Sequence, residues 1–232
     1  MSNKEVILDV PYYSEFIKAD GSIRHIEVFK RRSCGIISLK MALDYFSNQK
    51  RGRNITLEKL IETALKNGAY KLRKGATKGG GWVYSGLVRT LQFYGYNAWR
   101  RHFFILPKDL NVFKEEGVGE KSLDGYKKQV LSEIEISFKN SLDKGLPFLV
   151  SIFKDLGSKK SPHLIVITGY REKDGKLTGL FINDPHNPKN GAKNRPLHKN
   201  QFISIADFVK IWRKTALFIE AKAYNSKNKV TK

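Results

Sequence analysis

A chain of 232 residues with 41% hydrophobic residues has the length of one ordinary domain and enough apolar material for a core, which excludes a disordered chain. Its 43 Lys and Arg against 22 Asp and Glu give a net charge of +21, and its single cysteine excludes internal disulfides and a multi-cysteine zinc site. No apolar run approaches the roughly 18 residues of a membrane span, and the first residues lack a signal-peptide pattern, so we expect a cytoplasmic protein.

The predicted elements come in the order helices first, antiparallel strands second. Apolar periodicity predicts helices at residues 34–46, 56–67, 82–94 and 127–141. Short β-rich runs predict strands at 148–153, 164–170, 177–182 and 216–223, with a short helix at 207–214. We therefore expect an α+β fold in a single domain over residues 1–224, with a helical part at about 33–145, a β-rich part at about 146–223 and a Lys-rich tail at 225–232.

Cys34 lies where a cysteine can become a nucleophile. A lone cysteine is most often a small buried hydrophobic residue. Here Ser33 suits the N-cap of a helix that is apolar over most of its circumference, so Cys34 would be the first helical residue. A helix N-terminus favours negative charge, and this position would therefore stabilise a thiolate.

His163 and Asp184 lie at the ends of two strands predicted to form a β-hairpin around Asp174-Gly175. Paired residue numbers in a hairpin have a constant sum, which is 349 for this turn, and His163 and Asp184 sum to 347. A register of 347 or of 349 would put their side chains on one face, directly opposite or as diagonal neighbours, whereas a register of 348 would separate them. A carboxylate beside an imidazole fixes its tautomer and supports its protonated form. Taken alone, each residue also fits a structural role at a strand end.

Several short motifs follow one another along the chain in a characteristic order. They are Asp9-Val10-Pro11-Tyr12-Tyr13-Ser14, Cys34-Gly35, Gly81-Trp82, His163 before Leu-Ile-Val-Ile-Thr-Gly-Tyr, and Ile182-Asn183-Asp184-Pro185. From about Asp9 to Ala221 the chain thereby resembles the papain-fold cysteine peptidases related to the bacteriocin-processing peptidases that cut after double-glycine leaders. The resemblance implies a papain-like fold, with a buried nucleophile helix packed on an antiparallel sheet.

The resemblance also implies a role for each matching residue. Cys34 would be the nucleophile, His163 the general base and then acid, and Asp184 the third member of the catalytic triad, which orients His163. The backbone amide of Cys34 would form part of the oxyanion hole. The family's other donor there is a glutamine, and this chain has Glu15 in that segment. An ionised carboxylate cannot donate, and loss of one such donor costs about a hundred- to a thousand-fold in rate.

Glu15 leaves two functions open. The first is a cysteine peptidase that cleaves a peptide bond through an acyl-enzyme, with Gly81 and Trp82 against a peptide or protein substrate and no cofactor. The second is a catalytically weakened family member that binds peptides or acidic partners without cleaving them.

Two other functions, metal binding and nucleic-acid binding, have weaker support in the sequence. His163, Asp184 and His186 could ligate a metal, but their spacing is not that of a common site. The positive charge attracts nucleic acid without specificity, but the basic residues are spread from Lys4 to Lys232, and lysine outnumbers arginine, which base recognition favours. The pattern favours a solvated basic surface over a specific nucleic-acid partner.

Overall fold

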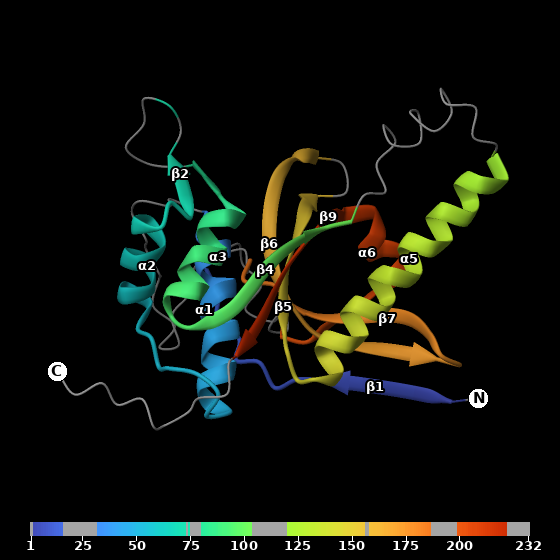
Figure 1. Ribbon diagram of the computed structural model, residues 1–232, viewed down its shortest axis with the longest axis horizontal. Coiled ribbons are helices and arrows are strands. Elements are labelled where there is room, and N and C mark those ends of the chain that lie inside the picture. The colour runs from blue at the N-terminus through green and yellow to red at the C-terminus, as the bar shows by residue number, and fades with distance from the viewer. Residues whose placement is uncertain are drawn as a thin grey trace, which may run out of the picture.

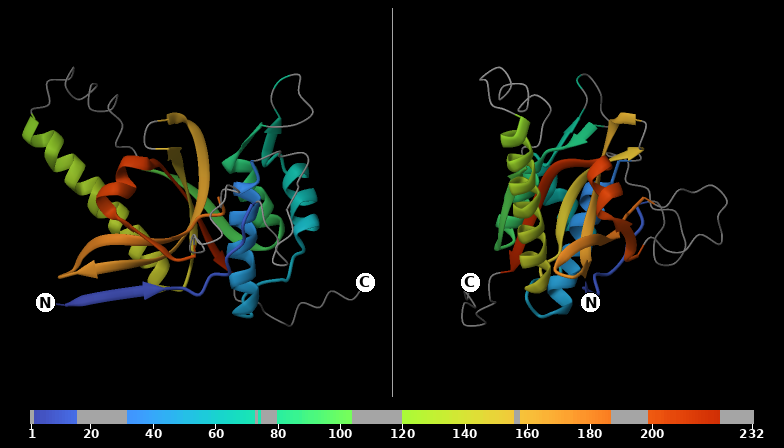
Figure 2. Two further views of the ribbon diagram at one scale, coloured as in Figure 1. Left: turned by 180° about the vertical axis from the view of Figure 1, so that it is seen from behind. Right: turned by 90° about the vertical axis from the view of Figure 1, so that its right-hand side faces the viewer.

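The computed structural model describes residues 2–15, 32–72, 74, 80–103, 120–155, 158–186 and 199–221, without the side chains of 120–130, 154–155 and 158–161. The predicted tail at 225–232 lies outside the described residues. Within them, a strongly twisted sheet lies between two groups of helices (Figures 1 and 2). One group is α1 (Cys34–Asn48), α2 (Leu57–Lys66) and α3 (Tyr84–Phe93), and the other is α5 (Glu120–Asp143) and α6 (Ile205–Ile211).

The main sheet is antiparallel and has seven strands. Its order is β4 (Tyr96–His102), β9 (Trp212–Ala221), β5 (Phe148–Asp155), β6 (Ser158–Lys173), β7 (Lys176–Asn183) and β8 (Gln201–Ser204), and β1 (Asn3–Ile7) also pairs with β6. Two short strands, β2 (Tyr70–Leu72) and β3 (Gly80–Trp82), form a separate hairpin. Helices followed by an antiparallel sheet confirm the predicted α+β fold.

The stretch predicted as helical also contains strands β2, β3 and β4, a difference from the expectation. β4 leaves the helical part and pairs along its whole length with β9, the last strand of the described chain. Its first residues alternate between buried Tyr96 and Ala98 and exposed Asn97 and Trp99. This alternation with a period of two is typical of a half-buried strand. It covers only Tyr96 to Trp99, which is too short a run to predict a strand between two helices from the sequence.

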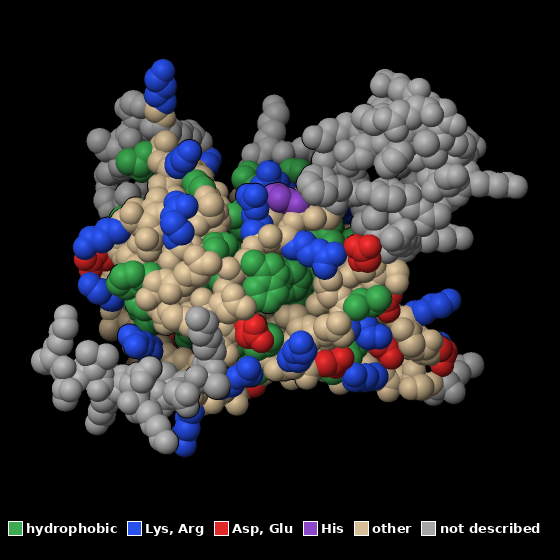
Figure 3. Space-filling view, viewed as in Figure 1, with side chains coloured by type: hydrophobic (Ala, Val, Ile, Leu, Met, Phe, Trp, Pro, Cys, Tyr) green, Lys and Arg blue, Asp and Glu red, His purple; other side chains and the backbone are tan. Residues whose placement is uncertain are grey.

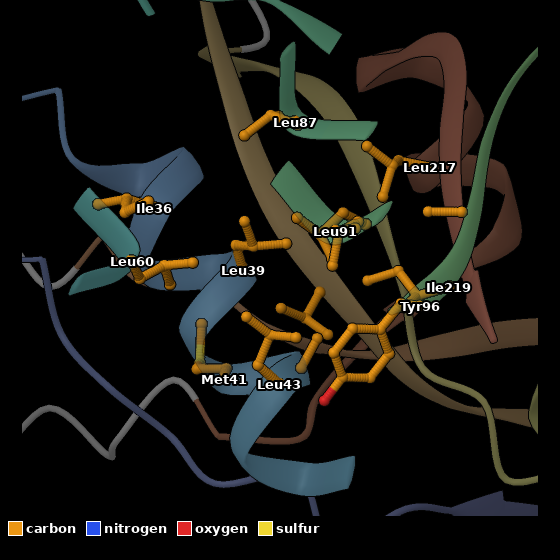
Figure 4. Packing of buried hydrophobic residues seen from close by; sticks show 14 of the residues in the cluster. Ile36, Leu39, Met41, Leu43, Leu60, Leu87, Leu91, Tyr96, Leu217 and Ile219 are labelled. Carbon is orange, nitrogen blue, oxygen red and sulfur yellow. The ribbon is translucent and has the colours of Figure 1, made fainter. Parts of the chain in front are cut away.

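Each face of the sheet has its own hydrophobic core, because consecutive strand residues point to opposite faces. On one face, Leu217 and Ile219 of β9 lie in one cluster with Leu39 of α1 and Leu91 of α3 (Figure 4). On the other face, the core is aromatic and centres on Phe138 of α5. The ring of Phe138 lies 4.6 Å from Phe148 and 5.5 Å from Trp212, centroid to centroid.

Helix α1 is buried on nearly every side, as its two apolar stripes predict. The hydroxyl of Ser38, one turn after Cys34, donates to the carbonyl of Leu164 in β6 at 3.0 Å. This buried hydrogen bond fixes the start of α1 against the strand that carries His163.

The surface of the described part of the molecule carries more basic than acidic side chains (Figure 3), as the net charge of the chain predicts. Figure 3 shows Lys and Arg side chains scattered over one face, with fewer Asp and Glu among them. None of the helices described is both long and apolar enough to cross a membrane.

Candidate active site

Cys34 is the first residue of α1 and is buried, with 5% of its surface exposed. Ser33 is the N-cap residue, as predicted, but its side chain does not cap the helix. Its hydroxyl donates instead to the backbone carbonyl of Glu15 at 3.3 Å. The amides of the first turn therefore receive no side-chain cap from Ser33, and that turn holds no acidic residue. The positive end of the helix dipole is left to act on Cys34.

The chain that enters α1 is held by the β2–β3 hairpin through two opposed hydrogen bonds. The Arg32 guanidinium donates to the carbonyl of Gly80 at 2.7 Å, and the Trp82 indole N–H donates to the carbonyl of Arg32 at 2.9 Å. The indole lies directly on Gly35, where an added Cβ would come within 2.4 Å of the ring. Only glycine leaves room for Trp82 beside Cys34. Trp82 therefore forms one wall next to Cys34.

The β6–β7 hairpin brings His163 and Asp184 together. Its turn is at Asp174 and Gly175, which have φ of 50° and 79°, as a tight two-residue hairpin requires. Paired residue numbers sum to 349 beside the turn and again at Val166↔Asn183, after two irregularities in between. A sum of 349 is one of the two registers that put His163 and Asp184 on the same face, and it makes them diagonal neighbours. Nε2 of His163 lies 2.6 Å from Oδ1 of Asp184.

Cys34 acts electrostatically on His163, so the two side chains are close to each other. Burial alone would lower the pKa of His163, because it disfavours the imidazolium. Negative charge on Cys34 and the hydrogen bond with Asp184 outweigh burial and raise this pKa to about 10. Burial would raise the pKa of Asp184, but the hydrogen bond to His163 and the positive charge there lower it overall. The surroundings thus favour a charged imidazolium between two anions.

A buried amide holds the segment that carries Asp184. Asn183 is completely buried, and its Nδ2 donates to the carbonyl of Val10 at 3.2 Å. Its Oδ1 accepts from the backbone N–H of Asn200 at 2.8 Å. One side chain thereby joins the end of β7 to the N-terminal segment and to the segment that leads into β8.

Glu15 lies between Cys34 and the segment after Asp184. Its backbone N–H donates to the carbonyl of Pro185 at 2.8 Å, and its carbonyl accepts from Ser33. Its side chain is only 2% exposed, and Oε1 lies 2.7 Å from Nδ1 of His186. The structure therefore brings Glu15 to the same place as Cys34, His163 and Asp184. It does not place Gly81 in these contacts: Gly81 is exposed on β3, opposite Lys71.

The sequence pattern suggested His186 only as a possible metal ligand, and it indicated no functional role for Tyr12. The hairpin register offers a signal for His186, because the sum of 349 pairs it with His163 if the ladder is continued beyond Asn183. The two rings meet edge to face with centroids 5.8 Å apart. Within the described residues, no three or more His, Cys, Asp or Glu side chains are grouped so as to hold a metal ion.

Together these contacts place a thiol, an imidazole and a carboxylate in sequence, the arrangement that cysteine-dependent acyl transfer requires. Among solved structures, the peptidase domain of Streptococcus ComA, a bifunctional ABC transporter of a quorum-sensing pathway, is similar at 16% identity and a TM-score of 0.44, over 85% of this chain and 100% of that domain. The comparison with curated proteins gives no significant match. The Peptidase_C39 like family matches residues 7–216, nearly the whole chain. The chain therefore belongs to the Peptidase_C39 like family.

Proposed function

We propose that this chain is a cysteine peptidase that cleaves a peptide bond through an acyl-enzyme at Cys34. The observation that supports the proposal most is the position of His163. Its imidazole is hydrogen-bonded through Nε2 to Asp184 at 2.6 Å, and Cys34 is close enough to raise its pKa. Family membership supports a peptide substrate independently of this geometry.

The proposed reaction has two halves. The Cys34 thiolate attacks the scissile carbonyl, and the carbonyl oxygen takes on negative charge beside the N-terminus of α1. His163, already protonated, gives its proton to the leaving amine and becomes neutral. A water molecule then loses a proton to His163 and attacks the thioester, which releases the acid and restores the ion pair. Asp184 keeps the ring of His163 oriented through both halves.

The peptide would lie across the surface that Trp82 forms beside Cys34. The indole covers Gly35 and is fixed by its hydrogen bond to Arg32. We propose that exposed Gly81 gives the peptide backbone close access there, because no side chain stands in the way.

Alkylation by iodoacetamide tests the nucleophile without any knowledge of the substrate. Cys34 is the single cysteine, so the mass gain of the intact protein reports this residue alone. At about pH 6 we expect a rate on the order of a hundredfold above that of free cysteine, because a thiolate is the reacting species. His163→Ala should reduce the rate to that of a free thiol. His102→Ala, in β4, is the matched control and should leave it unchanged. Slow alkylation that is insensitive to His163→Ala would contradict the proposal.

A catalytically weakened protein that binds peptides is the second candidate, and Glu15 is the observation that favours it. A buried carboxylate at the oxyanion position would repel the charge that develops on the carbonyl oxygen. The variant Glu15→Gln separates the two candidates in a peptide-cleavage assay. A gain of about a hundredfold or more would identify the native site as weakened by Glu15. A smaller change favours an active peptidase.

A further inference from the structure

A second carboxylate–imidazole pair, Glu15 with His186, lies beside the first. The two pairs share Asp184, because the backbone N–H of His186 donates at 2.8 Å to the same Oδ1 that contacts His163. Glu15 and His186 are 171 positions apart in the sequence, so no local turn joins them to each other. The pair is therefore specified by the tertiary fold, next to the reacting group.

One of the two oxygens of the Glu15 carboxyl group forms no hydrogen bond within the described residues. Its Oε2 is buried and has no hydrogen-bond partner in the described part of the chain, and the same holds for the hydroxyl of Tyr12. Burial and the charges of Asp184 and Glu15 raise the pKa of Tyr12, which keeps the phenol protonated near both carboxyl groups. A buried polar atom without a partner costs about 1–3 kcal/mol. Such atoms are rare in native proteins, and a catalytic role is one reason for keeping them.

An ionised Glu15 by itself would oppose the reaction, but Glu15 and His186 together need not. With one shared proton, the pair has no net charge. The proton on the carboxyl group makes Oε2 a donor, as in active sites that keep a carboxylic acid neutral. The proton on the imidazole makes His186 a cation that offsets the carboxylate.

We propose that Glu15 and His186 act together as the second donor of the oxyanion hole, in the place of a side-chain amide. This inference rests on the proposed peptidase function and adds His186 to it as a positioning residue. The pair forms no covalent bond and transfers no proton: it stabilises the negative oxygen while Cys34 and His163 do the chemistry. The titratable groups around the pair are Tyr12 on its own segment, Cys34 on α1, His163 on β6 and Asp184 after β7.

Acyl transfer from p-nitrophenyl acetate tests the pair, since release of nitrophenolate requires a tetrahedral oxyanion at Cys34. Rates are corrected with Cys34→Ala. Glu15→Ala should lower the rate about a hundred- to a thousand-fold, and Glu15→Gln should recover most of that loss. His186→Phe should be similarly damaging with Glu15 present, but should cost less than about tenfold in the Glu15→Gln background. His102→Phe is the control for replacing a partly exposed histidine.

The pH profile gives a second readout that a purely structural role would not move. The ratio of the wild-type rate to the Glu15→Gln rate should fall at alkaline pH, because His163 is common to both proteins whereas only the wild type has a proton shared between Glu15 and His186. The profile needs no His186 variant, so it decides the question even if His186→Phe does not fold.

Each outcome separates this inference from the proposed function. If Cys34 alkylates slowly regardless of His163, the peptidase proposal fails first. If Cys34 alkylates rapidly but the wild type does not release nitrophenolate, or His186→Phe is equally harmful in both backgrounds, the pair is not a donor. A rise of about a hundredfold for Glu15→Gln at every pH would also overturn it, because the pair would then be an obstacle.

Discussion

Replacing Gly35 by alanine is expected to disturb the wall beside Cys34. The new Cβ would lie 2.4 to 2.7 Å from three atoms of the Trp82 indole. To regain ordinary van der Waals contact the ring must move by about 1 Å. It is not loose enough to do so at no cost, because its N–H is bonded to Arg32 at 2.9 Å and its face is packed by Tyr70, with centroids 4.9 Å apart.

The magnitude follows from three contributions. Overpacking costs about 1–3 kcal/mol. Loss of the Trp82–Arg32 hydrogen bond adds about 1 kcal/mol. Alanine offsets up to about 1 kcal/mol, because it is a better helix former than glycine at Gly35. We expect Gly35→Ala to lower the free energy of unfolding by about 1–3 kcal/mol.

Urea denaturation followed by tryptophan fluorescence measures this loss. Gly81→Ala is the matched control, because an added Cβ there meets nothing within 4 Å, and it should change stability by less than about 0.5 kcal/mol. In a Trp82→Leu background the cost of Gly35→Ala should largely disappear. A Gly35→Ala protein as stable as the wild type, or one with the same loss in both backgrounds, would refute this account of Gly35.

Three other predictions concern the site and the surface. In an NMR titration, His163 should stay protonated well above its ordinary pKa of 6.5, up to about pH 10. The stabilisation that this proton gives the fold is therefore complete below pH 6.5 and is lost as the pH rises through about 10. Asp184→Asn should lower that pKa, and an unchanged titration would exclude the ion pair. Asn183→Ala should cost about 2–4 kcal/mol in urea denaturation, because it leaves the carbonyl of buried Val10 and the backbone N–H of half-buried Asn200 unpaired. A loss below about 1 kcal/mol would contradict this. Binding to duplex DNA should be non-specific, with a Kd near or above about 1 μM at physiological salt. Tight, sequence-dependent binding in a titration at that salt would contradict the interpretation of the basic residues as a solvated surface.

The elements that local sequence controls were predictable. Helix α2 follows Thr56, whose hydroxyl accepts from the backbone N–H of Lys59 at 3.3 Å, as an N-cap residue should. The β6–β7 hairpin follows Asp174-Gly175, because these two residues adopt the left-handed conformations that a tight turn needs. The register between the strands then placed Asp184 beside His163.

What could not be predicted depends on residues far apart in the chain. The pairing of β4 with β9 joins the middle of the chain to its end, and no local pattern specifies that partner. The Ser33 hydroxyl donates to the carbonyl of Glu15, 18 positions earlier in the chain, and it does not cap α1. The partnership of Glu15 with His186 is likewise a product of the fold.

The strand order also bears on how copies of this protein behave in a crowded solution. Within the described residues, β4, β8 and the five-residue β1 each pair with one neighbour only, and an edge strand with unpaired backbone groups can add a strand from another molecule. β8 has only four residues, too few for a long new ladder. β4 has seven, and it carries the adjacent cations Arg100 and Arg101, whose like charges would face each other in an edge-to-edge pair. Part of the positive charge of this chain thus protects it from aggregation.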